Sequence, residues 1–214
     1  MDGECSSTCL NQRCCHSTHR DDPLNHQGDR MSKAIFLDRD NTIIHNDDDL
    51  GDAKMVSLIP GAAEAMKCLH HEGFKLIVIT NQGGVARGMF TEDDVHAVHA
   101  EVQRQLQEAT GEDDLVCGWY FCPWHPEGTV ETYRREHPWR KPQPGMLLQA
   151  AKDHDLQLDF CWMVGDQERD VLAGLAAGCR GVRLAPGAVD TKAEFTCDSL
   201  AEAAAYILTK EGAA

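Results

Sequence analysis

Long hydrophobic runs are absent from the sequence. No apolar stretch approaches the roughly 20 residues that a membrane-spanning helix requires, so we predict that the protein does not insert into a membrane. Internal repeats and low-complexity segments are also absent after residue 30. Of the 214 residues, 42% are hydrophobic and 26% are charged. This composition predicts a globular chain, long enough to form a core without disulfides or a metal.

Positive charge is scarce. Only 20 Lys and Arg residues stand against 35 Asp and Glu residues, which gives a formal net charge of −15. Non-specific nucleic-acid binding depends on Lys and Arg side chains that neutralise phosphates, so no nucleic-acid partner is expected. The same deficit means that a phosphorylated ligand would need a locally positive site or a bound cation.

A regular disulfide framework is missing too, although the chain has ten cysteines. Several of them, such as Cys117 and Cys161, fall in apolar segments, where a free cysteine behaves as a small hydrophobic residue. No hydrophobic secretory segment opens the sequence. We therefore expect free thiols and a reducing, cytoplasmic compartment.

Residues 1–30 differ from the rest because they are polar, lack aromatic residues and show no periodicity. They are predicted to form a disordered tail that precedes one domain at 31–214. An alternative is a small metal site made from Cys and His residues of this segment, but their spacing fits no zinc pattern. The candidates for it are Cys5, Cys9, Cys14, Cys15, His16 and His19.

From residue 31 onward, short apolar segments alternate with helical patterns. This alternation predicts an α/β fold with a doubly wound, Rossmann-like parallel sheet. Two connectors, 41–59 and 123–142, are long enough to act as lids or specificity elements, and the second is a loop insertion after the third strand. Strands are predicted at 33–38, 74–80, 115–122, 160–166 and 180–185, and helices at 62–72, over about 18 residues after Thr91, at 144–155, at 168–179 and after Ser199.

Polar side chains occur where the predicted strands end. Asp38 and Asp40 close the first strand, Thr80 and Asn81 the second, and Asp166 the fourth. Because parallel strands have their carboxyl ends at one edge of the sheet, these side chains are expected to converge there. Three converging carboxylates repel one another unless a cation lies between them, and hard oxygen ligands suit Mg²⁺.

A phosphate site is predicted at the same edge. Lys141, near the end of the second long connector, would neutralise both the carboxylates and phosphoryl oxygens. Thr80 and nearby backbone N–H groups would hold a phosphate. Because an aspartate can act as a nucleophile and form an aspartyl-phosphate, this set of residues favours phosphoryl transfer.

Four short motifs occur in order at these strand ends: DRDNT (38–42), TN (80–81), RKP (140–142) and GDxxxD (165–170). Together they resemble the four motifs of the haloacid dehalogenase superfamily of phosphotransferases, and the resemblance covers essentially all of 31–214. It implies the Rossmann-like fold of that superfamily with a minimal cap. The alternative is an acidic cluster without a catalytic role on an inert sheet, which the order and placement of all four motifs disfavour.

The resemblance implies a role for each carboxylate. Asp38 would be the nucleophile that attacks phosphorus. Asp40 would protonate the leaving oxygen and then activate water, since the first step leaves it deprotonated for the second. Mg²⁺ would be held by Asp38, the backbone carbonyl of Asp40 and Asp166, while Asp170 would orient the site.

The resemblance also assigns residues to the substrate. Thr80 and Asn81 would hold the phosphoryl group, and Lys141 would balance its charge. Arg140 would contact the rest of the substrate molecule. The partner expected from this resemblance is a small phosphorylated sugar, bound by a monomeric enzyme.

Within the superfamily, three segments resemble the group that removes the 7-phosphate of D-glycero-D-manno-heptose 1,7-bisphosphate. They are TNQGGVARGMF (80–90), CPWHPEG (122–128) and RKPQPGML (140–147). Histidinol-phosphate phosphatases share several of these motifs but usually lack the VARG element at 85–88, so that activity is the alternative. A non-catalytic phosphate-binding module is a second alternative, disfavoured because binding alone needs neither a nucleophile nor an acid.

The loop between the third strand and the RKP motif departs from the pattern of this group. The group typically has a zinc site there, with Cys-x-His followed by Cys-x-Cys. Here Trp124 occupies the expected His position, and His137 and Trp139 occupy the second pair. Cys122, His125 and His137 offer at most three of the four ligands of a structural zinc, so we predict that zinc is absent. Packing of Trp124 and Trp139 would stabilise the loop instead.

Overall fold

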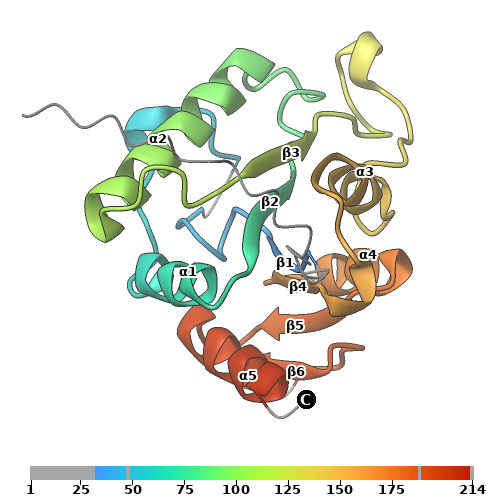
Figure 1. Ribbon diagram of the computed structural model, residues 1–214. Coiled ribbons are helices and arrows are strands. Elements are labelled where there is room, and N and C mark those ends of the chain that lie inside the picture. Colours follow the sequence, from blue (N-terminus) through green and yellow to red (C-terminus); the bar gives the residue numbers. More distant parts are fainter. Residues whose placement is uncertain (1–31, 47–48, 188, 213–214) are drawn as a thin grey trace, which may run out of the picture. The chain divides into compact units, whose positions relative to one another are not determined.

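Six parallel strands form one sheet at the centre of the described chain (Figure 1). The computed structural model describes residues 32–46, 49–187 and 189–212, so the segment predicted to be a tail, 1–30, lies outside the described residues. Across the sheet the strand order is β3-β2-β1-β4-β5-β6. The strands are β1 (Ala34–Leu37), β2 (Lys75–Asn81), β3 (Gly118–Cys122), β4 (Trp162–Gly165), β5 (Arg180–Leu184) and β6 (Phe195–Cys197).

Five of these strands overlap the segments predicted from the sequence, with small differences at their ends; β2, for example, extends one residue further, to Asn81. The prediction missed β6, because three residues are too few to show a strand pattern. It also began the third strand too early, since pairing with β2 starts at Gly118 rather than at 115. Leu115 and Val116 are apolar because they are buried in the core just before the strand begins.

Helices cover both faces of the sheet, with α1, α2 and α5 on one face and α3 and α4 on the other (Figure 1). Side chains of β1 alternate accordingly: Ile35 and Leu37 pack in the first core cluster, and Ala34 and Phe36 in the second. The predicted doubly wound α/β fold is confirmed. The helices are α1 (Ala62–His71), α2 (Glu92–Thr110), α3 (Gly145–His154), α4 (Glu168–Ala177) and α5 (Leu200–Gly212).

The strand order reverses between β1 and β4. From β1 the chain adds β2 and β3 on one side, and it then returns to place β4, β5 and β6 on the other. In an open parallel sheet, such a reversal leaves a crevice beyond the carboxyl ends of the two strands that meet there. The sequence motifs that follow β1 and β4 are therefore brought to this crevice.

Both long connectors carry a short 3-10 helix. The connector after β1 contains η1 (Ala53–Met55), and the insertion after β3 contains η2 (Glu131–Tyr133); a third, η3 (Leu158–Phe160), precedes β4. Within the described residues neither connector folds into a separate unit, which agrees with the minimal cap that the resemblance implies. Among the described helices, none combines the length and the hydrophobicity needed to cross a bilayer.

Candidate active site

The carboxylates that follow β1 and β4 lie at the reversal of the sheet. The backbone N–H of Asp38 donates a hydrogen bond to the carbonyl oxygen of Val164, at 2.9 Å, which ties the end of β1 to β4. Gly165 is needed at the end of β4, because a Cβ there would lie 2.5 Å from Oδ2 of Asp170. The missing side chain lets the Asp170 carboxylate lie against the strand, close to Asp38 and Asp166.

Lys141 is the charge that holds these carboxylates together. Its Nζ lies 2.8 Å from Oδ1 of Asp38 and 2.8 Å from Oδ1 of Asp170, and it donates to the carbonyl oxygen of Ile79 at 2.8 Å. All three charged side chains are buried. Burial alone would lower the pKa of Lys141, but the two carboxylates outweigh it and raise that pKa above its usual value. Lys141 therefore stays protonated.

Asp38 titrates near neutral pH in the absence of a cation. Burial raises its pKa to about 7, opposed by Lys141 and assisted by the negative charges of Asp170 and Asp40. Burial likewise raises the pKa of Asp166. Carboxylate oxygens of Asp38, Asp166 and Asp170 lie within 4.8 Å of one another, so the set has the spacing and the hard oxygen donors of a divalent-cation site.

Asp170 differs from the other two carboxylates because both of its oxygens already have partners. Oδ1 pairs with Lys141, and Oδ2 accepts a hydrogen bond from the backbone N–H of Gln167 at 2.9 Å. The second bond also forms part of the cap of α4. These contacts suit the orienting role expected for Asp170 and leave Asp38 and Asp166 as the more available cation ligands.

Asp40 lies at the start of a tight turn in which Asn41 has a left-handed backbone (φ 54°) and the N–H of Ile43 donates to the carbonyl oxygen of Arg39 at 2.9 Å. The guanidinium of Arg39 donates to Oδ1 of Asp40 from Nε (3.1 Å) and Nη2 (3.0 Å). Gln82 Nε2 donates to Oδ2 at 2.8 Å. The carboxyl group of Asp40 is thus held on both oxygens beside the nucleophile position.

The residues predicted to hold a phosphate lie next to this group. Oγ1 of Thr80 is buried and accepts a hydrogen bond from Gln82 Nε2 at 2.8 Å. The amide of Asn81 pairs with the backbone of Lys141, accepting from its N–H (3.0 Å) and donating to its carbonyl oxygen (3.1 Å). Asn81 therefore fixes the position of Lys141, in addition to the phosphate contact that remains a prediction.

A cavity of about 270 Å³ brings most of the predicted residues together. Asp38, Asp40, Asn81 and Asp166 line it, and Arg169 lines it as well. Thr80 and Lys141 are buried, and neither is among its lining residues. The cavity thus offers carboxylates for a cation and an acid near a buried cation, which is the combination that phosphoryl transfer requires.

Basic side chains converge around Gly83, in the segment that follows β2. A Cβ at Gly83 would lie 3.1 Å from Nη1 of Arg87, 3.2 Å from His125 Cδ2 and 3.6 Å from Nη1 of Arg140. Burial lowers the pKa of Arg140, and the positive charges of Arg169 and Arg87 lower it further. Such mutual repulsion is relieved when an anion binds among the cations.

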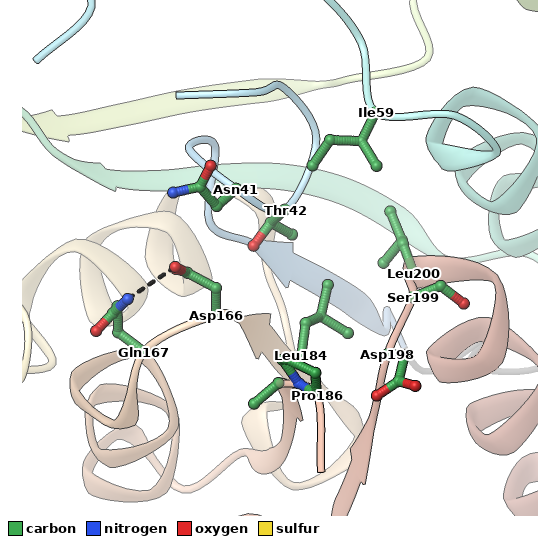
Figure 2. Close-up of a pocket in the computed structure, with 11 residues that line it drawn as sticks. Asn41, Thr42, Ile59, Asp166, Gln167, Leu184, Pro186, Asp198, Ser199 and Leu200 are labelled. Carbon is green, nitrogen blue, oxygen red and sulfur yellow. Dashed lines mark hydrogen bonds between the residues drawn. The ribbon is translucent and has the colours of Figure 1, made fainter. Parts of the chain in front are cut away.

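A second cavity, of about 390 Å³, adjoins the first (Figure 2). Asp166 and Gln167 line both cavities and are joined by a hydrogen bond of 2.8 Å. Ile59, Leu184 and Leu200 contribute apolar surface to the second cavity. Because it offers fewer polar groups for a phosphate, the first cavity remains the candidate reaction site.

The loop after β3 is packed by aromatic rings. The His137 ring stacks on Trp124, with centroids 3.7 Å apart and an interplanar angle of 20°. The Nδ1 atoms of His125 and His137 accept backbone N–H groups from Glu127 and Trp139, each at 3.1 Å. This packing agrees with the role expected for Trp124, while the absence of zinc stays a prediction that metal analysis of the purified protein can test.

Comparisons with known proteins agree with the motifs. Residues 138–209 match the HAD-hydrolase-like family model. The chain is 43% identical over 150 residues to the D-glycero-β-D-manno-heptose-1,7-bisphosphate 7-phosphatase of Rhodopseudomonas palustris, covering 70% of this chain and 82% of that protein. This chain belongs to the haloacid dehalogenase-like hydrolases. The family and fold predicted from the sequence are confirmed.

This hydrolase is also similar to two further heptose bisphosphate phosphatases, one by sequence and one by fold. It is 38% identical over 147 residues to the D-glycero-α-D-manno-heptose-1,7-bisphosphate 7-phosphatase of Burkholderia mallei, covering 69% of this chain and 76% of that protein. Its fold matches the D,D-heptose 1,7-bisphosphate phosphatase of B. bronchiseptica complexed with magnesium and phosphate, with a TM-score of 0.70 and 28% identity. That match covers 84% of this chain and 99% of the other.

The sequence prediction for this hydrolase assigned no role to Arg39, Gln82, Arg87 or Arg169. Gln82 could have been found, because it stands two residues after Thr80 and so projects to the same side of an extended segment. Arg39 lies between two aspartates, and its neighbours alone did not show that its side chain turns toward Asp40. Arg87 and Arg169 come from separate segments, and only the fold shows that both lie near Arg140.

We expect the affinity for Mg²⁺ to fall steeply with pH below 7. A proton on Asp38, whose pKa lies at about 7, must leave before the carboxylate can ligate the ion. One displaced proton weakens the apparent affinity about tenfold per pH unit in this range. Isothermal titration with MgCl₂ between pH 5.5 and 8 measures this slope. An affinity that stays constant across that range would contradict it, and Asp38→Asn serves as the control without this proton.

We also expect Lys141→Met to destabilise the fold by about 3–5 kcal/mol, because it leaves buried carboxylates without their counter-charge. Urea unfolding without metal at pH 8 measures the loss. The double variant Lys141→Met/Asp170→Asn removes one of those carboxylates and is expected to recover part of it. Simple additivity of the two single-variant losses would show that Lys141 and Asp170 are not coupled.

Proposed function

We propose that this protein is a Mg²⁺-dependent phosphomonoesterase that removes the 7-phosphate of D-glycero-D-manno-heptose 1,7-bisphosphate through a phosphorylated Asp38. The observation that carries the proposal is the buried Asp38, paired with Lys141 at 2.8 Å and placed beside an acid, Asp40, at the reversal of the sheet. The named activities of the relatives support the choice of substrate.

The first step requires an ionised nucleophile. Lys141 opposes the effect of burial on Asp38 and so favours its carboxylate form. An oxygen of Asp38 then forms a bond to phosphorus while the bond from phosphorus to the sugar oxygen breaks, and Asp40 gives its proton to that oxygen. In the second step Asp40 takes a proton from a water molecule, and the water oxygen forms a bond to phosphorus. The bond from phosphorus to the Asp38 oxygen breaks, which releases inorganic phosphate and restores the carboxylate.

The carboxylate set fits Mg²⁺, with Asp38, Asp166 and the backbone carbonyl of Asp40 as its protein ligands. When bound there, Mg²⁺ would supply positive charge that screens the carboxylates from the phosphoryl oxygens. Thr80 and Asn81 would contact the phosphoryl group from the end of β2, and Lys141 would balance its charge.

The basic cluster favours a bisphosphate over histidinol phosphate. The charges of Arg169 and Arg87 lower the pKa of Arg140, and a second phosphate bound beside Arg140 would relieve this repulsion. Arg87 is also paired with Asp49. The leaving portion of histidinol phosphate carries an amine that is positive at neutral pH and would be repelled. For this reason we keep histidinol phosphate as the second candidate substrate.

We further propose that residues 31–214 carry the complete activity and that the protein acts as a cytoplasmic monomer without zinc or a nucleic-acid partner. The packed core formed by the described residues within 31–214 supports the first statement. The acidic composition supports the absence of a nucleic-acid partner. Equal specific activity of a chain that begins at Met31 would support the dispensability of 1–30, and light scattering would give the oligomeric state.

We expect a preference of about 100-fold in kcat/KM for heptose 1,7-bisphosphate over histidinol phosphate, equivalent to roughly 2.7 kcal/mol of differential transition-state binding. Phosphate release with Mg²⁺ measures it, using both anomers of the bisphosphate because the relatives differ in this respect. Asp38→Asn is the blank and should be inactive.

Arg140→Gln tests the basic cluster in the same assay. It should narrow the preference by lowering kcat/KM for the bisphosphate more than for histidinol phosphate, because it removes a cation from the second-phosphate position. A wild-type preference for histidinol phosphate would contradict the proposed substrate. Activity of Asp38→Asn equal to that of the wild type would contradict the proposed nucleophile.

A further inference from the structure

Two buried side chains hold the acid Asp40, and the mechanism above gives neither of them a role. Arg39 is fully buried and donates to Oδ1 of Asp40 from Nε (3.1 Å) and Nη2 (3.0 Å), with Nη2 also 3.2 Å from Oδ2. Gln82 is 3% exposed and donates to Oδ2 at 2.8 Å. Donors therefore approach both oxygens of the carboxyl group and define its plane.

The surroundings of Arg39 are unfavourable for a residue that serves stability alone. Its Nη1 is buried and has no hydrogen-bond partner among the described residues, which costs free energy. Burial is the main cause that lowers the pKa of His99, and the nearby charge of Arg39 lowers it further, so the ring is neutral. Within the described part of the chain, the one carboxylate paired with Arg39 is Asp40, a residue that the proposed chemistry uses.

Gln82 connects the same carboxyl group to the phosphate site. Its Nε2 donates to Oδ2 of Asp40 and to Oγ1 of Thr80, each at 2.8 Å. Both hydrogens of this amide nitrogen thus have acceptors. The orientation of Asp40 is therefore fixed relative to the end of β2, where the phosphoryl group is expected.

We propose that Arg39 and Gln82 are positioning residues that hold the Asp40 carboxyl group so that it can transfer a proton to the leaving oxygen of the substrate. The inference rests on the proposed function, because it needs Asp40 to be the acid. An aspartate that is not held can turn about its two side-chain torsions, and only part of its conformations face the substrate. The charge of Arg39 alone would not fix the plane, since that requires the fork of Nε and Nη2.

The test compares two substrates that differ in their need for an acid. The sugar oxygen of heptose 1,7-bisphosphate leaves as an alkoxide unless it receives a proton. The leaving group of p-nitrophenyl phosphate is stable as an anion near neutral pH and needs no proton. The variants are Arg39→Lys, which keeps the charge and loses the fork, and Gln82→Met, which keeps the length and loses the donor; kcat/KM is measured with Mg²⁺ for both substrates.

We expect Arg39→Lys to lose about 100-fold in kcat/KM on the bisphosphate and less than about fivefold on p-nitrophenyl phosphate, since general acid catalysis contributes on this scale. Gln82→Met should also lose more kcat/KM on the bisphosphate than on p-nitrophenyl phosphate, with a smaller loss than Arg39→Lys. Asp40→Asn, which removes the acid itself, should show the largest difference between the losses in kcat/KM on the two substrates. Arg180→Lys is the matched control, because Arg180 forms a similar fork with Glu194 at the start of β5 and should lose activity on neither substrate.

Equal losses on both substrates in Arg39→Lys and Gln82→Met would overturn the inference and leave these residues a structural role. Activity on both substrates equal to that of the wild type would also overturn it. If Arg39→Lys does not fold, as shown by its near-UV circular dichroism, the split in Gln82→Met decides. A wild-type protein that hydrolyses neither substrate would instead refute the proposed function, so the two failures are distinguishable.

Discussion

A buried lysine between two buried aspartates is the interaction on which the rest of the site depends. Lys141 lies 2.8 Å from a carboxylate oxygen of Asp38 and of Asp170, and none of the three side chains is more than 7% exposed. Breaking a buried pair of this kind is costly, because it leaves charge without a partner or solvent. The arrangement therefore fixes where Lys141, Asp38 and β4 can lie relative to one another. Asn81 and Gly165 serve the same constraint, the first by holding the Lys141 backbone and the second by giving Asp170 space.

The topology of the sheet explains why these residues meet at all. The order β3-β2-β1-β4-β5-β6 puts the end of β1 between the ends of β2 and β4. Motifs separated by more than a hundred residues in the chain thus face one cavity. The segment after β2 contributes Arg87, and the loop after β3 contributes Arg140, which lies near both Arg87 and the cavity-lining Arg169. This arrangement suits a substrate with two phosphates, one reacting at the carboxylates and one bound by arginines.

Much of this could be predicted from the sequence, because the fold places strand ends together by a general rule. The pattern of apolar segments predicted five strands and the doubly wound sheet, and Asp38, Asp40, Asn81 and Asp166 were correctly expected to share one edge. The short β6 carries too few residues for a pattern. The contact of Arg39 with Asp40 depends on the side-chain torsions of the two residues, which a sequence pattern does not specify. The proximity of Arg87 to Arg140 depends on the paths of two loops, and loops lack the sequence periodicity that predicts helices and strands.

Detection of a phosphoryl group on Asp38 would identify this residue as the nucleophile. The protein would be mixed with p-nitrophenyl phosphate, whose leaving group needs no proton, and Mg²⁺, then quenched in acid within milliseconds and digested for mass spectrometry. Asp40→Asn, in which water is activated poorly, would be treated in parallel. We expect a phosphoryl group on the peptide that contains Asp38, with greater occupancy in Asp40→Asn than in the wild type. A phosphoryl group on a different residue, or steady release of phosphate with none detected on the protein in either form, would contradict it.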